Sequence, residues 1–415
     1  MSGPSAAAPP VASPAVESSA AGPRASASPA PAKRLRVSPS ALRRLTADPW
    51  AELRALAMLD RVAPDVPQPG AAVRVRRSRI TLLRRSVQVG FLLTVASIGV
   101  SFARWVHGLE AGRIVGERPP GVEGFLPIAA FMSFRYWLAR GVVTQIHPAG
   151  LVIFVLALAL GLLAKKSFCS WVCPVGAISE GLARISRAIF RAKMHLPRAL
   201  DVPLRGIKYL LLAFFAWVIV IRMSADDVGA FLSAPYSRVA DIKMLYFFEH
   251  PSTTAAIVLA ALALLSIVVP YFWCRYLCPY GGLLGLVSML SPLKVTRHAP
   301  SCIECGLCAR ACPSHLPVDR LERVRSDECF SCLSCVAACP VPRALRLETP
   351  GPWRRAVRPV AFAALVLILF AGGTAVARLA GHWRTSITND EYLARIHELD
   401  GPQYSHVEGT TGTRR

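Results

Sequence analysis

The chain has 415 residues, of which 53% are hydrophobic and only 18% are charged, and its mean hydropathy is +0.42. This composition argues against two or three soluble domains and is typical of a membrane protein. The net charge of +23 does not indicate nucleic-acid binding, because the arginines gather beside apolar stretches, where positive charge sets topology and attracts anionic lipid. All twelve cysteines fall in regular motifs, which suits a reducing compartment.

The N-terminal residues 1–70 are rich in Ala, Pro and Ser, and the first 33 contain no Leu, Ile, Phe, Trp or Tyr. Such a stretch buries too little apolar surface to fold, so we predict a disordered tail without the hydrophobic core of a signal peptide. A short surface helix is expected over residues 48–59.

Five apolar stretches follow, and each is predicted to cross the membrane as a helix. They are residues 86–103, 148–164, 209–221, 251–272 and 359–377. A crossing needs about 17–25 residues, which the third stretch reaches only if the flanking Lys208 and Arg222 extend toward the interface. An apolar but short stretch at 125–136 is expected to be re-entrant or interfacial.

Positive charge alternates along the chain. Lys and Arg number 14 before the first span, 4 in residues 106–148, 8 in 165–206, 2 in 223–250 and 11 in 274–355. Because positively charged loops remain in the cytoplasm, this alternation predicts a cytoplasmic N-terminus and an external C-terminus.

Residues 302–340 contain two copies of C-x2-C-x2-C-x3-C-P, offset by 27 residues. This is the spacing of bacterial ferredoxins with two [4Fe–4S] clusters, in which the fourth cysteine of each run binds the other cluster. The predicted ligand sets are Cys302, Cys305, Cys308 and Cys339 for one cluster, and Cys329, Cys332, Cys335 and Cys312 for the other. A zinc site fits triple cysteine runs poorly, and disulfides leave the doubled spacing unexplained.

A second cysteine motif, C-x3-C-P, follows both the second and the fourth span. Its cysteines are Cys169, Cys173, Cys274 and Cys278. The copies lie 105 residues apart, each after two spans, so the membrane region is predicted to be a parallel repeat with both motifs on the cytoplasmic face. Three interpretations stay open: a further metal or redox centre, a redox-active dithiol, or reduced cysteines that pack as small hydrophobes.

The first C-x3-C-P motif leads into a predicted amphipathic helix at the inner membrane surface. Its apolar face is expected to carry Ile178, Leu182, Ile185 and Ile189. His147 and His250 lie at the outer edges of spans, where interfacial polar residues are commoner than haem or quinone contacts. Four arginines face either a quinol pocket or, more simply, lipid headgroups: Arg104, Arg135, Arg140 and Arg222.

Taken together, the motifs resemble the membrane polyferredoxins of the NapH/NosR type over residues 80–345, and the YccM-like branch most of all. The resemblance lies in two spans, Cys-x3-Cys-Pro, two more spans, Cys-Arg-Tyr-Leu-Cys-Pro-Tyr-Gly and a two-cluster ferredoxin segment. It implies a multi-pass protein of the bacterial inner membrane that relays electrons between the quinone pool or a cytoplasmic donor and a redox partner. It also implies that the eight ferredoxin cysteines are cluster ligands.

We therefore expect a mainly α-helical, polytopic membrane protein with five transmembrane helices and a small cytoplasmic α+β two-cluster ferredoxin-like domain. The expected parts are the tail at 1–70, a four-span region with both C-x3-C-P motifs at 80–295, the ferredoxin-like domain at 296–348, the fifth transmembrane helix at 357–379 and a short external tail at 380–415.

The expected cofactors are two [4Fe–4S] clusters, with a possible third metal or redox centre at the C-x3-C-P cysteines. The expected role is that of an electron-transfer component, similar to a quinol dehydrogenase, rather than a stand-alone enzyme. The rival hypotheses are a redox-sensing assembly or regulatory factor and a copper reductase that uses the C-x3-C-P cysteines.

Overall fold

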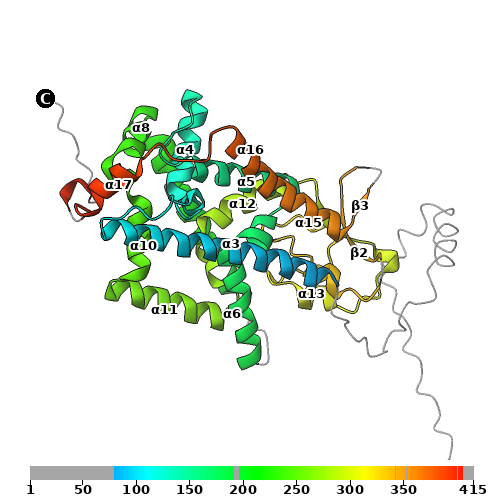
Figure 1. The fold of residues 1–415 in the computed structure, drawn as a ribbon. Coiled ribbons are helices and arrows are strands. Elements are labelled where there is room, and N and C mark those ends of the chain that lie inside the picture. The colour runs from blue at the N-terminus through cyan, green and yellow to red at the C-terminus, as the bar shows by residue number, and fades with distance from the viewer. Residues whose placement is uncertain (1–78, 191–195, 342, 352–353, 400, 405–415) are drawn as a thin grey trace, which may run out of the picture. The chain divides into compact units, whose positions relative to one another are not determined.

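A computed structural model describes residues 79–190, 196–341, 343–351, 354–399 and 401–404. The predicted tail at 1–70 and its helix at 48–59 lie outside the described residues. The described part consists of helices and one small sheet (Figure 1).

The helices in chain order are α3 (Arg79–Glu110), α4 (Pro127–Arg140), α5 (Pro148–Ala164), α6 (Pro174–Phe190), α7 (Arg198–Ala216), α8 (Ala225–Ser233), α9 (Pro235–Arg238), α10 (Ala240–Glu249), α11 (Thr253–Val268), α12 (Pro279–Met289), α13 (Leu307–Ala311), α14 (Ser334–Ala338), α15 (Pro359–Leu367), α16 (Gly373–Leu379) and α17 (Asn389–Ile396). Four π-helical turns are η2 (Phe168–Val172), η3 (Trp217–Arg222), η4 (Trp273–Leu277) and η6 (Ile368–Gly372). Three 3-10 turns are η1 (Pro120–Phe125), η5 (Ala299–Ser301) and η7 (Pro402–Tyr404).

Three helical runs among the described residues are long and apolar enough to cross a membrane: Arg79–Glu110, Ala199–Arg222 and Pro359–Leu379. The pair α10 and α11, bent by 76°, makes a fourth if the two form one span. The apolar helix α5 is shorter, with 17 residues. Every predicted span thus falls in an apolar helix, while a total of five crossings stays a prediction.

The burial pattern of α6 is the reverse of that in a soluble protein. Ile178, Ile185 and Ile189 are 55%, 48% and 60% exposed. The buried face carries small and polar residues, including Ser179 and Glu180. A helix that exposes its large apolar side chains in this way is suited to contact with lipid.

The polar face of α6 packs against α3 through a buried ion pair. Arg84 Nη2 donates to Glu180 Oε1 at 2.7 Å, and Arg184 donates to the same carboxylate. Burial alone would raise the pKa of Glu180, but the hydrogen bonds from Arg84 and Arg184 lower it to about 2. The pair therefore stays ionised and fixes α6 to the start of α3.

The strands of the small sheet flank the ferredoxin-like segment in the chain. Strand β1 (Lys294–Arg297) precedes the cysteine loops and β2 (Leu345–Glu348) follows them, and the two pair antiparallel with Lys294 opposite Glu348. Strand β3 (Ala356–Val357) adds to the other edge of β2. The predicted mixture of helix and strand over 296–348 is found, with α13 and α14 between β1 and β2.

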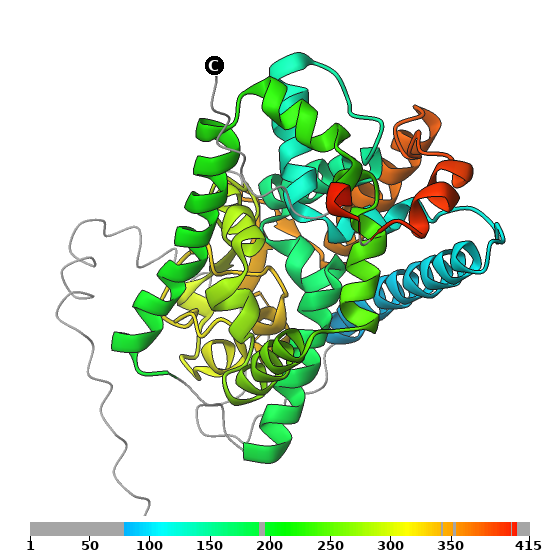
Figure 2. The same ribbon diagram turned by 90° about the vertical axis from the view of Figure 1, so that its left-hand side faces the viewer.

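Helix α3 has 32 residues and is therefore about 48 Å long. Near its N-terminus it packs against α14 and the cysteine loops, and near its C-terminus Trp105 packs against Tyr392 of α17. In Figure 1 the sheet and α13 lie toward one end of α3 and α17 lies toward the other. Figure 2 shows α12, in yellow-green, beside the green helix α7.

The segment expected to be a short external tail folds back onto the helices. Ile387, Tyr392, Ile396 and Tyr404 join a buried apolar cluster with residues of α3 and α10. Thr388 caps α17 by accepting a hydrogen bond from the N–H of Glu391. The segment is thus a small helical cap over the end of α3.

Candidate iron–sulfur site

The two ferredoxin-type cysteine loops have the same backbone conformation. Glu304 and Gly306 in the first loop, and Ser331 and Leu333 in the second, all have a positive φ between 48° and 67°. Each loop then enters a short helix, α13 or α14, that carries the third cysteine. Two left-handed residues wrap the chain tightly enough for three neighbouring thiols to face one point. The duplication read from the sequence is thus a structural repeat.

The eight cysteines divide between two small cavities in the crossed pattern that the spacing predicts. One cavity is lined by Cys302, Cys305, Cys308 and Cys339, and the other by Cys312, Cys329, Cys332 and Cys335. The fourth thiol of each set comes from the other loop, as in ferredoxins with two clusters. The structure therefore brings both predicted sets together, and their role as ligands stays a prediction.

The donor sets suit iron–sulfur clusters better than single metal ions. A zinc ion draws its four sulfurs to about 2.3 Å from its centre, whereas a cubane cluster carries its thiolates on separate irons. Among the residues that the structure describes, no three His, Cys, Asp or Glu side chains stand close enough for one ion. Burial raises the pKa of the Cys312 thiol to about 12.

The C-x3-C-P cysteines also come together, since all four line a single cavity. They are Cys169, Cys173, Cys274 and Cys278. Each is a free thiol rather than half of a disulfide. The two copies of the motif follow α5 and α11, and the parallel repeat stays a prediction.

Both C-x3-C-P motifs have the same local structure, which explains their proline. The first cysteine lies in a π-helical turn, η2 or η4, and the second stands immediately before α6 or α12, with proline as the first residue of the helix. Cys278 Sγ accepts the N–H of Gly281 at 3.2 Å. Proline suits this position because its missing N–H has no acceptor there, and the helix N-terminus favours a thiolate.

Three lysines without exposed surface lie between the C-x3-C-P cysteines and the second ferredoxin-type loop. Lys165 Nζ donates to the carbonyl of Ser326 at 2.8 Å, and Lys208 pairs with Glu328. Lys166 Nζ has no hydrogen-bond partner and lies 5.0 Å from the ring centre of Phe330. Its charge acts on Cys169, Cys274 and Cys278. Sequence reasoning does not identify these lysines as site residues, because their partners are remote in the chain.

Residues inside the first C-x3-C-P motif hold the second ferredoxin-type loop directly. Ser170 Oγ donates to the carbonyl of Phe330 at 2.6 Å, and Trp171 Nε1 donates to the carbonyl of Ser331 at 3.2 Å. A cavity of about 320 Å³ lies at this junction and is lined by Cys169, Cys274 and Cys332, among others. The two kinds of cysteine site are therefore neighbours.

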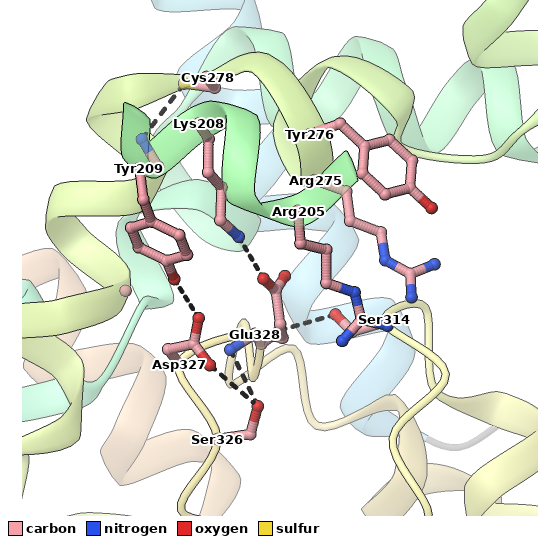
Figure 3. Close-up of polar contacts among 12 residues, drawn as sticks. Arg205, Lys208, Tyr209, Arg275, Tyr276, Cys278, Ser314, Ser326, Asp327 and Glu328 are labelled. Carbon is pink, nitrogen blue, oxygen red and sulfur yellow. Dashed lines mark hydrogen bonds and ion pairs between the residues drawn. The ribbon is translucent and has the colours of Figure 1, made fainter. Parts of the chain in front are cut away.

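The second C-x3-C-P motif is held instead by α7. Arg275 Nη2 and the Tyr276 hydroxyl donate to the two carboxylate oxygens of Asp201, at 2.9 Å and 2.5 Å. Figure 3 shows the adjacent contacts of α7 with the loop before Cys329: Lys208 pairs with Glu328. In the same view the Tyr209 hydroxyl donates to Asp327. Helix α7 thus joins one cysteine motif to the loop that begins the other.

The polar residues singled out at span edges have structural contacts. His147 is buried within the protein, and its Nε2 lies 2.6 Å from the carbonyl of Ser237. Arg135 donates to the carbonyls of Val220 and Met223 at the end of η3. Arg140 pairs with Asp226, and Arg104 and Arg222 are exposed. None of the four arginines is among the residues that line the cavity beside the C-x3-C-P cysteines.

Comparison with known proteins agrees with this geometry. The 4Fe-4S binding domain family matches residues 146–197 and 252–298, which contain the two C-x3-C-P motifs, and the 4Fe-4S dicluster domain family matches residues 294–340. The putative electron transport protein YccM of Escherichia coli is 41% identical over 335 residues, which cover 79% of this chain and 92% of YccM. No solved structure matches the chain.

More distant relatives match smaller parts of the chain. The ferredoxin-type protein NapH of Escherichia coli is 26% identical over 64% of this chain and 88% of its own length. The protein NirI of Paracoccus denitrificans is 29% identical over 64% of this chain, which spans 36% of NirI.

The fold, the cysteine sites and these relatives define an iron–sulfur membrane protein of electron transport. The chain belongs to the family of NapH/NosR-type membrane polyferredoxins that includes YccM.

Proposed function

We propose that this protein relays single electrons between the quinone pool or a cytoplasmic donor and a redox partner. Two [4Fe–4S] clusters are held by the crossed sets that line the two small cavities. An iron–sulfur cluster so held carries one electron at a time, at a potential between about −700 and +450 mV that nearby charge and hydrogen bonds set. The buried lysines and the backbone of both loops are the groups that set it in this protein.

A third iron–sulfur centre is held by Cys169, Cys173, Cys274 and Cys278. The observation in favour is Lys166, whose fully buried ammonium lacks a hydrogen bond and acts on three of these thiols. A buried cation of this kind is costly unless enough negative charge lies near it; the Asp327 carboxylate supplies one charge, and four neutral thiols supply no more. A cluster ligated by four thiolates supplies the missing negative charge. The matched 4Fe-4S binding segments support the same choice.

The single observation that carries the relay is the direct contact between the two kinds of cysteine site. Ser170 and Trp171, which lie between Cys169 and Cys173, hydrogen-bond the backbone between Cys329 and Cys332. The three sites therefore form a continuous path from the membrane helices into the ferredoxin-like domain. Packing this dense leaves no need for a moving carrier between them.

Orientation follows from charge. The strongly basic segments before the first span, after the second span and around the ferredoxin-like domain belong in the cytoplasm of a bacterium, and the C-terminal cap belongs outside the inner membrane. In this arrangement the ferredoxin-like domain meets a cytoplasmic donor or acceptor, and the membrane part meets the quinone pool. The partner is a redox protein and not a nucleic acid.

The test is an iron count with an anaerobic redox titration followed by electron paramagnetic resonance, on the full chain and on two variants. We expect about twelve irons per chain, because three cubane clusters hold four each. Cys169→Ser should lose about four irons and keep the ferredoxin-type signals, whereas Cys332→Ser should lose a ferredoxin-type signal. About eight irons in both the full chain and Cys169→Ser would overturn the third centre, and an iron-free protein would overturn the relay.

The two rival functions give different results in the same preparations. A redox sensor would bind its partner differently on oxidation but show no sustained electron flow in vesicles. A copper reductase would bind Cu(I) at the C-x3-C-P thiols, and Cys169→Ser would abolish copper reduction without changing the iron count. A relay should be re-reduced repeatedly by quinol or by a soluble donor.

A further inference from the structure

A large apolar cavity of about 550 Å³ lies beside the C-x3-C-P cysteines, all four of which line it. Its other walls come from η1, α4, α5, α7 and α12. Sites for small molecules have volumes of roughly 300–1,000 Å³ and are mostly apolar with a few polar groups. Among the residues that line this cavity, Glu123 alone has a charged side chain.

Aromatic rings form much of the cavity wall. The rings of Phe131 and Phe154 stack with centroids 5.9 Å apart. Tyr280 contacts Phe154 and Phe168, with centroids 5.8 Å and 5.9 Å away. Such a wall favours a flat, conjugated ring, which stacks on aromatic faces and edges more favourably than a flexible acyl chain does.

The rim of the cavity reaches the outer surface of the helices. Phe125, Ile128 and Val175 line the cavity and are 39%, 48% and 40% exposed. In a membrane protein such exposed apolar residues face lipid, so a ligand dissolved in the bilayer can enter sideways. A water-soluble substrate would have to cross this apolar rim.

The polar group of the cavity belongs to a buried ionic cluster. Glu123 Oε1 accepts from Arg118 at 2.8 Å, and Oε2 accepts from the N–H of Gly150 at 3.0 Å. Arg118 also pairs with Asp241 at 2.6 Å, and His147 Nδ1 lies 3.8 Å from Glu123 Oε1. The carboxylate is thus held in place beside an imidazole, and because its side chain has no exposed surface, a ligand hydroxyl reaches its lone pairs only after a shift of the cavity wall.

We propose that this cavity binds the ring of a membrane quinone or quinol. The inference rests on the proposed function and names the place where that function meets the quinone pool. When a quinol becomes a quinone it loses two electrons and the protons of its two O–H groups. The redox site that the C-x3-C-P cysteines would hold can take the two electrons one at a time and pass each on to the ferredoxin-type clusters. Glu123, which has no exposed surface in this structure, and His147 behind it are the carboxylate and imidazole at this wall that can each take up one of the two protons. A phospholipid tail would use neither group.

The test is labelling of the full chain, in phospholipid nanodiscs, with a photoreactive short-chain benzoquinone. We expect labelled peptides from α4, α5 or α12, displaced by unlabelled quinone but not by excess phospholipid. Ile153→Trp on α5 and Leu211→Trp on α7 fill the cavity and should each reduce labelling at least tenfold. Leu210→Trp is the matched control, because Leu210 is 71% exposed, does not line the cavity and should leave labelling unchanged.

The iron count and dithionite-reduced spectra of the same variants separate this inference from the relay. Unchanged iron with lost labelling and lost reduction by quinol supports the site. Labelling that persists in both filling variants, or that lipid displaces as well as quinone does, overturns it even if all clusters are present. Blocked labelling in a protein without reducible clusters would instead overturn the relay and leave the binding site standing.

Discussion

Among single residues, Lys166 gives the strongest electrostatic support for a negatively charged centre at the C-x3-C-P cysteines. Its ammonium has no exposed surface and no hydrogen-bond partner, yet Lys165 and Lys208 lie nearby and repel it. Three buried cations within one region are stable only with enough negative charge beside them. Asp327 and Glu328 supply two charges, and the clusters that we propose on either side would supply the rest.

Replacing Lys166 by Met should therefore lower the reduction potential of the centre at the C-x3-C-P cysteines. At a separation of about 8 Å and an effective dielectric constant of about 20, one charge is worth roughly 2 kcal/mol. For a one-electron couple this is about 90 mV. The measurement is a redox titration, with Lys243→Met as the control because Lys243 binds the carbonyl of Tyr404 in the C-terminal cap. Equal potentials in both variants would contradict an anionic centre beside Lys166.

The first C-x3-C-P motif requires a residue without a side chain at position 176, which is Gly176. A Cβ atom there would collide with the carbonyl oxygen of Cys169, whereas Gly181, on the same helix, has open space. Gly176→Ala should lower the free energy of unfolding by about 3 kcal/mol and release iron from this motif. Gly181→Ala should keep the iron and gain up to about 1 kcal/mol from helix propensity. Thermal unfolding and iron content of both variants check the difference.

The same element, a π-helical turn followed by a proline-started helix, serves two purposes in this fold. In the first copy the residues between the cysteines bind the ferredoxin-type loop, and in the second copy Arg275 and Tyr276 bind Asp201 of α7. Helix α7 then completes the connection, because Lys208 and Tyr209 hold Glu328 and Asp327 just before Cys329. The repeat is therefore symmetric at its thiols and asymmetric in its attachments.

The pair of Lys208 and Glu328 should behave as a buried ion pair whose partners depend on each other. Lys208→Met leaves the Glu328 carboxylate, with an Oε2 that already has no hydrogen-bond partner, uncompensated. We expect a loss of about 3–5 kcal/mol and loss of the cluster nearest Cys329. The double variant Lys208→Met with Glu328→Gln should recover part of both. A double variant as damaged as the sum of the single ones would show that the two residues act independently.

How far the sequence predicts these elements depends on how local their causes are. The cysteine loops and the apolar helices follow from short spacings and from hydropathy, so the crossed sets and the helical positions are predictable. Helix α7 starts at Arg198, well before the predicted third span at 209–221. The reason is that Asp201 pairs both with Arg205 and with Arg275, a partner 74 residues away. The buried Arg118, Glu123 and Asp241 escape prediction for the same reason.

For the whole molecule, the length of α3 decides what lies on which side. At about 48 Å it is long enough to cross the roughly 30 Å of a hydrocarbon core and to place its two ends in different interfaces. The cysteine loops pack near its first turns and the C-terminal cap packs near its last turns. In the proposed topology the ferredoxin-like domain and the cap lie on opposite sides of the membrane, in line with the alternation of Lys and Arg along the sequence.

This topology predicts opposite labelling of two engineered cysteines by a membrane-impermeant maleimide. Arg320→Cys lies in the ferredoxin-like domain and Arg384→Cys lies beside the cap, and both native side chains are exposed. Right-side-out vesicles should label only Arg384→Cys, and inverted vesicles only Arg320→Cys, each above the background of the unmodified chain. Because the two sites are separated by the full length of α3, labelling of both from one side would contradict a membrane-crossing α3. Labelling of each from the opposite side would keep the crossing but reverse the orientation that the basic loops predict.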